Sequence, residues 1–253
     1  MISRVQDFVV PITMSPPAAS QEHKQQYVRR LFDGIAPRYD FLNHFLSSGF
    51  DILWRRKAVG FLRDEHPGRI LDVATGTADV AIEAARTLDA TVQGIDISGE
   101  MLKLAKAKVS RFGLVDRVLL ELGEAESLRF QTDSFDAATV AFGVRNFADV
   151  DQGLAEILRV LRPNGTLVIL EFSRPRTFPF RQLYGFYFRR VLPVIGGIVS
   201  KKKESYEYLP HSVMEFPDGD EFLDILTRAG FANTRQHTLS LGIATIYTGK
   251  KPG

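Results

Sequence analysis

The sequence predicts an α/β fold in which a mostly parallel, seven-stranded sheet carries helices on both faces and ends in an antiparallel strand pair. Two observations carry this prediction. Between residues 69 and 172, short apolar runs alternate with segments of helical periodicity, which is the pattern of right-handed crossovers in a parallel sheet. After residue 231, two strand-like runs flank "SLG", which indicates the antiparallel pair.

The expected elements follow in order along the chain. Apolar positions at helical spacing predict helices within residues 22–63. The alternating part then predicts strands at 69–74, 91–97, 118–123, 135–143 and 165–172, with helices at 79–88, 99–112 and 150–161 between them. A further helix is expected at 219–231, before the two final strands within 232–251.

Length and composition allow one sizeable domain. The chain has 253 residues, and its net charge of +2 gives no case for nucleic acid as a partner. It has no cysteine, and its five histidines lack ligand spacing, so we expect neither a disulfide nor a metal site. No apolar run could span a bilayer, and residues 1–20 lack the apolar core of a signal peptide. We expect a cytoplasmic protein, with 1–20 as a flexible arm and 21–253 as a single domain.

The loop after the first strand, "DVATGTAD", is the first candidate ligand site, because ligands of such sheets bind beyond the carboxyl ends of the strands. It lacks the Gly-Lys-Ser/Thr ending of a phosphate-binding loop. Gly76 is its one glycine, which leaves the backbone less room to approach a pyrophosphate. The loop therefore favours S-adenosylmethionine, which has no phosphate, and the Asp72 carboxylate is expected to hold its amino-acid tail.

Two further positions suit an adenosine ligand. Asp96 ends the second strand, twenty positions after Gly76, where an acid accepts hydrogen bonds from ribose hydroxyls. This suits NAD as well as S-adenosylmethionine, and the alternative for Asp96 is a helix cap. After the third strand, Glu124 and Ala125 stand where an adenine base would lie, although a solvated loop acid would look the same.

A nicotinamide dehydrogenase is the rival enzyme. Tyr247 and Lys251 have the four-residue spacing of short-chain dehydrogenases. That pair requires a helix, whereas these residues lie in a strand-like tail, so we discount it.

Two long segments resemble the signatures of one enzyme family. The first is "YDFLNHFLSSGFDILWRR", in which Tyr39, Asp40, Asn43, Ser47 and Trp54 are in register, and the second is "RVLRPNGTLVILEFS". With "SFDAATVAFGVRN" and the stretch "VLPVIGGIVSKKKESYEYLPHSVMEFP", they resemble the quinone-biosynthesis C-methyltransferases from about residue 24 to the end. The resemblance implies the class I, Rossmann-like methyltransferase fold.

The resemblance also implies a cofactor, a substrate and contacts. The cofactor would be S-adenosyl-L-methionine, contacted by Thr77, Asp96, Glu124 and Ala125. The substrate would be a lipid-soluble prenylated hydroquinone. Several positions depart from the family pattern, among them Leu42, Asp51, Asn164, Glu124 and Arg129. Ala141 stands where ubiquinone-type members often carry serine, which favours demethylmenaquinol over the ubiquinone branch or a dual specificity.

Methyl transfer to an aromatic carbon requires alignment, a dry site and a group that stabilises or makes a phenolate. "FGVRNF" supplies candidates just after the fourth strand. Arg145 could hold a phenolate as a fixed cation, and Asn146 could orient it or a water. Because arginine stays charged, we prefer an electrostatic role for Arg145 to a role as base. The alternative is an arginine paired with a surface acid such as Asp149.

The segment "YDFLNHFLS" offers further catalytic candidates. If it is helical, Asp40, Asn43 and Ser47 share one face, and the N-terminal helical part, 21–63, could fold over the cofactor as a lid. Tyr39 would then lie against the sulfonium. The alternative is a helix packed on the sheet with a solvated polar side. His211 and Tyr206 are lesser candidates for handling protons.

The segment 174–221 interrupts the α/β pattern. The overlapping stretch 173–203 holds eight Lys or Arg and six Phe or Tyr, which suits a helix resting on anionic lipid headgroups. A peripheral position at the membrane is one interpretation, and a cap over the site or a homodimer face is the other.

The alternative to an enzyme is a cofactor-binding subunit that catalyses no reaction of its own.

Overall fold

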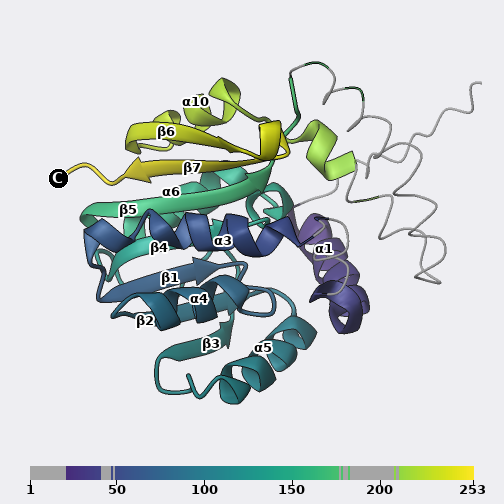
Figure 1. Ribbon diagram of the computed structural model, residues 1–253, viewed down its shortest axis with the longest axis vertical. Helices are drawn as coiled ribbons and strands as arrows, with labels where there is room; N and C mark the ends of the chain where they lie inside the picture. Colours follow the sequence, from purple (N-terminus) through teal and green to yellow (C-terminus); the bar gives the residue numbers. More distant parts are fainter. Residues whose placement is uncertain are drawn as a thin grey trace, which may run out of the picture.

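The computed structural model describes residues 21–40, 47, 49–176, 178, 182, 208 and 211–253. It confirms the predicted architecture: one seven-stranded sheet with the strand order β3-β2-β1-β4-β5-β7-β6 (Figure 1). The strands are β1 (Arg69–Val73), β2 (Thr91–Asp96), β3 (Val118–Leu122), β4 (Phe135–Ala141), β5 (Leu161–Phe172), β6 (Ala232–Leu239) and β7 (Ala244–Lys250). Along β3-β2-β1-β4-β5, each strand pairs in parallel with its neighbours, whereas β7 pairs antiparallel with both β5 and β6.

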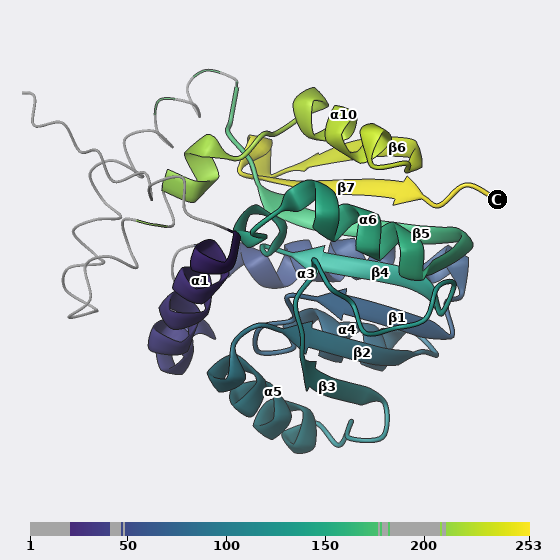
Figure 2. The same cartoon turned by 180° about the vertical axis from the view of Figure 1, so that it is seen from behind.

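The helices cover both faces of this sheet. The α-helices are α1 (Gln21–Ile35), α3 (Phe50–Gly60), α4 (Asp79–Thr87), α5 (Gly99–Arg111), α6 (Val150–Val160) and α10 (Asp220–Arg228). The short 3-10 turns are η1 (Ala36–Arg38), η2 (Arg63–Glu65), η3 (Val144–Asn146) and η5 (Ser240–Gly242). One core cluster joins α3, α4 and α5 to the sheet, and a second joins α6 and α10 to its other face. Figures 1 and 2 show α3 crossing one face and α6 the other.

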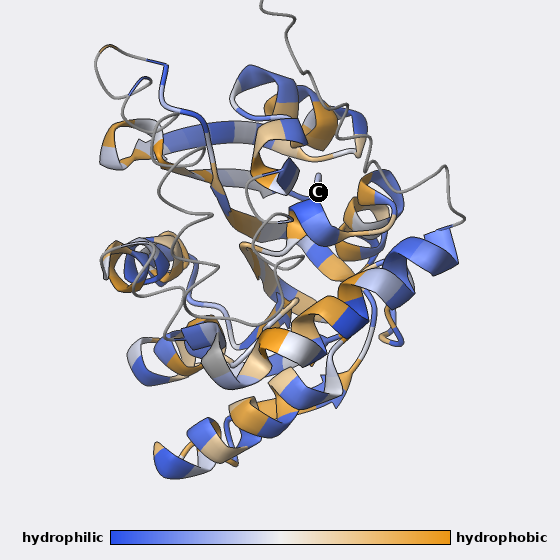
Figure 3. Ribbon diagram, turned by 90° about the vertical axis from the view of Figure 1, so that its right-hand side faces the viewer, coloured by the Kyte–Doolittle hydropathy of each residue, from blue (hydrophilic) through white to orange (hydrophobic). Residues whose placement is uncertain are grey.

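Local sequence explains why these helices form where they do. In α6, Leu154, Ile157 and Val160 are fully buried at helical spacing, and the Asp149 side chain caps the helix by accepting from the Gln152 amide. Ser98 caps α5 in the same way, accepting from the Met101 amide. In Figure 3 the helices carry polar and apolar turns together, as expected for elements with one face against a sheet.

One boundary differs from the sequence-based expectation. The helical pattern predicts a helix to residue 161 and a strand from 165, but α6 ends at Val160 and β5 runs from Leu161. Leu161 pairs with Phe135 of β4, and a register shift separates this pair from the ladder that resumes at Thr166. A β-bulge of this kind inserts residues without ending the strand, so the polar run "RPNG" lies within β5.

Helix α1 lies across the carboxyl ends of the parallel strands rather than on a face of the sheet (Figure 1). Lysine 24 on this helix donates to the Phe147 carbonyl in the loop after β4, and the Ser98 hydroxyl, after β2, donates to Asp33. In the part of the chain described, no helix is long and apolar enough to cross a membrane. The predicted arm 1–20 and most of the insertion 174–221 lie outside the described residues.

Candidate active site

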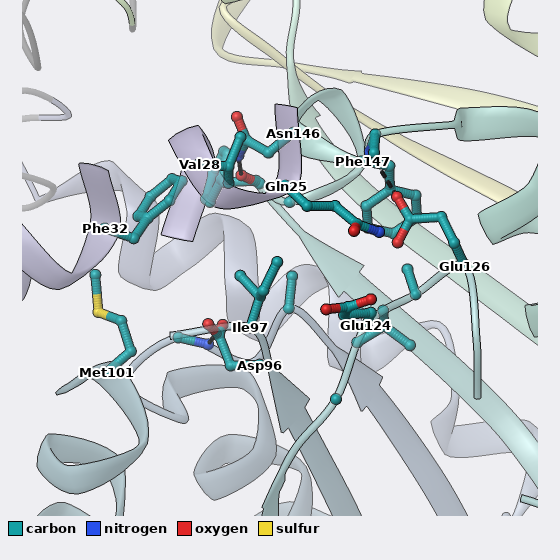
Figure 4. Close-up of a pocket in the computed structure, with 18 of the residues that line it drawn as sticks. Gln25, Val28, Phe32, Asp96, Ile97, Met101, Glu124, Glu126, Asn146 and Phe147 are labelled. Atoms are coloured by element: carbon teal, nitrogen blue, oxygen red, sulfur yellow. Dashed lines mark hydrogen bonds between the residues drawn. The ribbon is translucent and has the colours of Figure 1, made fainter. Parts of the chain in front are cut away.

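A pocket opens at the carboxyl ends of β1, β2 and β4, under helix α1 (Figure 4). Its wall comes from α1, from the residue directly after η1, from the start of α5, from the ends of β1, β2 and β4, and from the loops that follow the first four strands. The lining residues are Gln25, Val28, Phe32, Tyr39, Val73, Ala74, Gly76, Asp96, Ile97, Met101, Gly123, Glu124, Ala125, Glu126, Ala141, Phe142, Gly143, Asn146, Phe147 and Ala148. The pocket thus lies where sheets of this kind bind ligands.

The loop after β1 is compact because three of its residues are left-handed. Ala74, Gly76 and Ala78 have φ values of 54°, 56° and 67°. Its position is fixed by the Gly76 amide, which donates to the Asp96 carboxylate at 2.8 Å. A Cβ on Gly76 would stand 3.7 Å from the Tyr39 ring, so this ring lies close over the loop. Gly76 and Tyr39 therefore both reach the pocket, and their predicted contacts with the cofactor stay predictions.

Asp96 lies at the centre of this arrangement. Its second carboxylate oxygen accepts from the Ser98 amide at 2.8 Å, so both oxygens are held by backbone N–H groups. Burial raises the pKa of Asp96 to about 6, although the bonds from Ser98 and Gly76 oppose the rise. Each oxygen keeps a lone pair for a further donor, which suits the predicted contact with ribose hydroxyls.

Asp72 does not stand in the pocket wall, which corrects the expectation that its carboxylate holds the amino-acid tail. Its oxygens accept from the hydroxyls of Thr75 and Thr139, both at 2.6 Å, and the side chain is buried beneath the loop. Burial raises the pKa of Asp72 to about 6, and the nearby Asp96 adds to the rise. Asp72 is therefore placed to hold the loop in shape from below.

Thr77 and Asp40 also lie outside the lining, in a polar network beside α5. The Thr77 hydroxyl donates to Asp40 at 2.5 Å and accepts from Lys108 at 3.0 Å. Lys108 in turn pairs with Asp40 and Asp79, both at 2.7 Å. The structure thus gives Asp40 a lysine partner instead of a place beside the reacting methyl, and it gives Thr77 a part in fixing the start of α4.

The predicted lid segment is described only in part. Asn43 lies outside the described residues, so its predicted role stays a prediction. Ser47 donates to Asp51 at 2.6 Å, at the start of α3. The residues that cover the pocket belong to α1, within the predicted lid 21–63, and Gln25, Val28 and Phe32 reach into it from this helix.

The loop after β3 forms the other side of the pocket. Glu124 and Ala125 both line it, and Ile97 lies between Glu124 and Met101, which is on the opposite side of the pocket near Phe32 (Figure 4). Glu126 holds the neighbouring loop by accepting from the Ala148 and Asp149 amides at 2.5 and 3.3 Å. An apolar slot with an acid at its edge suits the adenine ring and its amino group, so the geometry allows the adenine contact that stays a prediction for Glu124 and Ala125.

The structure brings Asn146 into the pocket and turns Arg145 away from it. Asn146 Oδ1 accepts from the Tyr208 hydroxyl at 3.0 Å. The Arg145 guanidinium is buried and donates to Glu171 at 2.6 Å and to the Phe142 carbonyl at 2.7 Å. The alternative pairing with Asp149 is wrong, because Asp149 caps α6 and accepts from the Gln21 side chain.

The Arg145–Glu171 pair is not fully satisfied. Among the described residues, Arg145 Nε and Glu171 Oε2 are buried without a hydrogen-bond partner. Burial raises the pKa of Glu171, and the charge and hydrogen bond of Arg145 oppose the rise. The positive charge of Arg145 also acts on the Tyr208 hydroxyl, whose pKa burial raises. Tyr208 therefore stays protonated and can donate near neutral pH.

Sequence reasoning missed Tyr208, Glu171 and the lining residues of α1. Tyr208 lies two residues from Tyr206, and a tyrosine in "YEYLP" gives no local sign of its partner. Tyr206 itself lies outside the described residues. His211 is exposed and lies 3.1 Å from Glu215, away from the pocket wall.

The charges of the wall identify the kind of ligand. The lining includes the carboxylates Asp96, Glu124 and Glu126 and, among the described residues, no lysine or arginine. Such a wall suits a ligand with a sulfonium and an ammonium and opposes a pyrophosphate. The dehydrogenase pair is absent from it: the Tyr247 hydroxyl accepts from the Gly219 amide, and Lys251 pairs with Asp133. Within the described ranges no group of side chains could hold a metal ion.

Comparison with known proteins agrees with this site. The model of the ubiE/COQ5 methyltransferase family matches residues 20–251. The chain belongs to this family. A Geotalea daltonii protein named "Ubiquinone/menaquinone biosynthesis C-methyltransferase UbiE" is 53% identical over 230 residues, which are 90% of this chain and 97% of that one. A Bacteroides fragilis "Demethylmenaquinone methyltransferase" is 42% identical over 236 residues, covering 93% and 96% of the two chains.

Solved structures of lower identity show the same fold. An S-adenosylmethionine-dependent methyltransferase from Thermotoga maritima has a TM-score of 0.63 at 20% identity, covering 88% of this chain and 99% of that one. A Haloferax volcanii methyltransferase in complex with its Trm112 activator has a TM-score of 0.65 at 17% identity, covering 88% and 98%. These structures confirm the fold, and membership of the ubiE/COQ5 methyltransferase family confirms the methyltransferase class and S-adenosylmethionine as the cofactor.

The raised pKa of Asp96 predicts how cofactor binding depends on pH. Above pH 6 the carboxylate is ionised and both of its oxygens accept from hydroxyl groups; below pH 6 it gains a proton, so one oxygen becomes a donor and the other a weaker, uncharged acceptor. We expect the affinity for S-adenosylhomocysteine, measured by calorimetry, to fall by up to about tenfold per pH unit below 6.

Two variants assign this titration. Asp96→Asn should weaken binding and flatten the pH profile, because it removes the titrating group. Asp72→Asn removes the second carboxyl of similar pKa and should keep the profile. A flat profile in Asp72→Asn with a normal one in Asp96→Asn would contradict the assignment.

Proposed function

We propose that the chain transfers a methyl group from S-adenosylmethionine to a ring carbon of a prenylated hydroquinone, and that demethylmenaquinol is its acceptor. The observation that carries the proposal is the pocket side formed by Ala141, Phe142 and Asn146, where an aromatic wall meets an oriented amide. The names of the relatives, which include a demethylmenaquinone methyltransferase, support this acceptor. Ala141, where ubiquinone-type members often carry serine, lines the pocket and supports the same branch.

The chemistry sets what the chain must supply. The cofactor provides a methyl group on a positively charged sulfur, which is already a good electrophile. The ring carbon becomes a good nucleophile only as the neighbouring hydroxyl loses its proton. The pKa of such a phenolic hydroxyl is about 10. For each methyl gained, the ring carbon gives up one proton, so the balance is one proton released.

The residues around Asn146 could favour the ionised acceptor. Asn146 is held by the Tyr208 hydroxyl at 3.0 Å, and its amide nitrogen could donate to an acceptor oxygen. The sequence predicts that Arg145 holds the phenolate directly, but its guanidinium is paired with Glu171. Arg145 would therefore act on the acceptor through its electric field and by fixing the η3 turn. Phe142 and Phe147 keep the pocket side dry, which strengthens such electrostatic effects.

Direct turnover tests the proposal. Purified protein would be mixed with methyl-labelled S-adenosylmethionine and a reduced short-tail demethylmenaquinone, and the product analysed by mass spectrometry. We expect one labelled methyl on the ring carbon. A parallel assay with a ubiquinone-branch benzoquinol should give slower turnover. Binding of S-adenosylhomocysteine without any labelled quinone would contradict the proposed reaction and support a non-catalytic subunit.

Removing Arg145 should separate catalysis from cofactor binding. Arg145→Ala should leave the affinity for S-adenosylhomocysteine nearly intact, since Arg145 does not line the pocket, but lower kcat by about a hundredfold or more. The change also leaves Glu171 charged and buried, which can cost about 3–5 kcal/mol of stability. The double variant Arg145→Met/Glu171→Leu avoids this cost, and its kcat should fall equally. Wild-type turnover in the double variant would remove Arg145 from the mechanism.

We propose in addition a peripheral contact with anionic membrane, since a prenylated acceptor resides in the bilayer. The basic and aromatic composition of 173–203 supports it. Co-sedimentation should be stronger with vesicles rich in anionic lipid than with neutral vesicles, and should weaken with salt. Binding that ignores the anionic content would contradict an electrostatic contact and leave a cap or a homodimer face for this segment.

A further inference from the structure

Arg29, on α1, links two of the loops that form the cofactor pocket. Its Nε donates to the Ile97 carbonyl at 3.2 Å, directly after β2. Its Nη2 donates to Glu124 Oε1 at 3.2 Å, directly after β3. Arg29 is half-buried and does not line the pocket, whereas both of its partners do. One planar guanidinium thus sets the spacing between the strand ends that carry Asp96 and Glu124.

The bond from Arg29 also orients the Glu124 carboxylate. It occupies Oε1, which leaves Oε2 for a donor in the pocket, where Glu124 lies beside the apolar wall of Ile97 and Ala125 (Figure 4). The amino group of adenine is such a donor. A purine that carries a carbonyl oxygen in place of the amino group would instead meet a carboxylate oxygen, and two acceptors repel each other.

We propose that Arg29 is a positioning residue that sets the preference of the pocket for adenine by holding Glu124. The inference rests on the adenosine part of the cofactor and not on the proposed acceptor. It explains why the contact uses arginine: a guanidinium has several donors in a fixed plane and can bond the Ile97 carbonyl and the Glu124 carboxylate at once, whereas an ammonium on a flexible stem holds no such geometry.

A merely stabilising ion pair is the competing explanation. The Arg29 and Glu124 side chains are 42% and 33% exposed, and ion pairs at that exposure contribute little to folding. If Arg29 positions Glu124, its removal should change the discrimination between ligands strongly and the stability of the protein only slightly. If Arg29 only holds α1 in place, its removal should lower the affinity for every ligand by the same factor.

The test compares two product analogues by calorimetry: S-adenosylhomocysteine and S-inosylhomocysteine, in which a carbonyl replaces the amino group of the base. The wild-type protein should prefer the adenosyl form. In Arg29→Met, the ratio of the two dissociation constants should shrink by about tenfold, because a hydrogen bond to a charged group is worth at least that factor. Glu124→Ala should give a similar ratio, and adding Arg29→Met to it should change the ratio no further.

Two more variants serve as controls. Arg30→Met removes the same charge from the neighbouring, exposed position, where Arg30 contacts the Gln26 carbonyl of its own helix, and should keep the wild-type ratio. Arg29→Lys keeps the charge and should behave like Arg29→Met. If Arg29→Met weakens both ligands alike, or leaves both affinities unchanged, the proposal is overturned. Since the readout is binding, absence of quinol methylation would leave this result valid and contradict only the proposed function.

Discussion

The site depends on one interaction between two strand ends: the Asp96 carboxylate at the end of β2 accepts the Gly76 amide of the loop after β1. This bond joins the loop to the carboxylate that we expect to hold the ribose, and the Ser98 amide on the other oxygen joins the start of α5 to the same group. A rise in the pKa of Asp96 from 3.8 to about 6 means that keeping the buried group charged costs roughly 3 kcal/mol. The fold bears this cost where hydroxyl donors of a ligand can recover part of it.

Helix α1 brings both an acidic and two basic side chains to the site. The acid makes it harder to keep Asp96 ionised, and the basic residues balance part of the negative charge. Asp33 brings a further acid next to Asp96 and raises its pKa, while it accepts the Ser98 hydroxyl at 2.5 Å. Arg29 and Lys24 bring positive charge to the rim, to Glu124 and to the Phe147 carbonyl. The pocket therefore has an acidic wall with cations just outside it, so a cationic ligand is attracted inward while the helix stays docked.

The sequence was sufficient for features that depend on local pattern. Alternating strands and helices predicted the sheet, and the placement of Gly76, Asp96 and Glu124 at strand ends predicted that they would meet at one edge. Where a role depended on a distant partner, the sequence failed. Asp72 accepts a hydrogen bond from Thr139, 67 positions away, and Arg145 donates to Glu171, 26 positions away. The local sequence of the loop after β1 and of the η3 turn does not indicate which distant side chain will contact it.

The buried Arg145–Glu171 pair shows why such a partner matters to function. Each buried charge alone would be costly, and together they leave Arg145 Nε and Glu171 Oε2 unpartnered among the described residues. A pair with an unused donor and an unused acceptor is weak evidence for stability. Its charges lie close enough to the Tyr208 hydroxyl to act on its pKa, and Tyr208 holds Asn146. The pair thus links the core of the sheet to the amide in the pocket, and its field reaches the proposed acceptor side although neither Arg145 nor Glu171 lines the pocket.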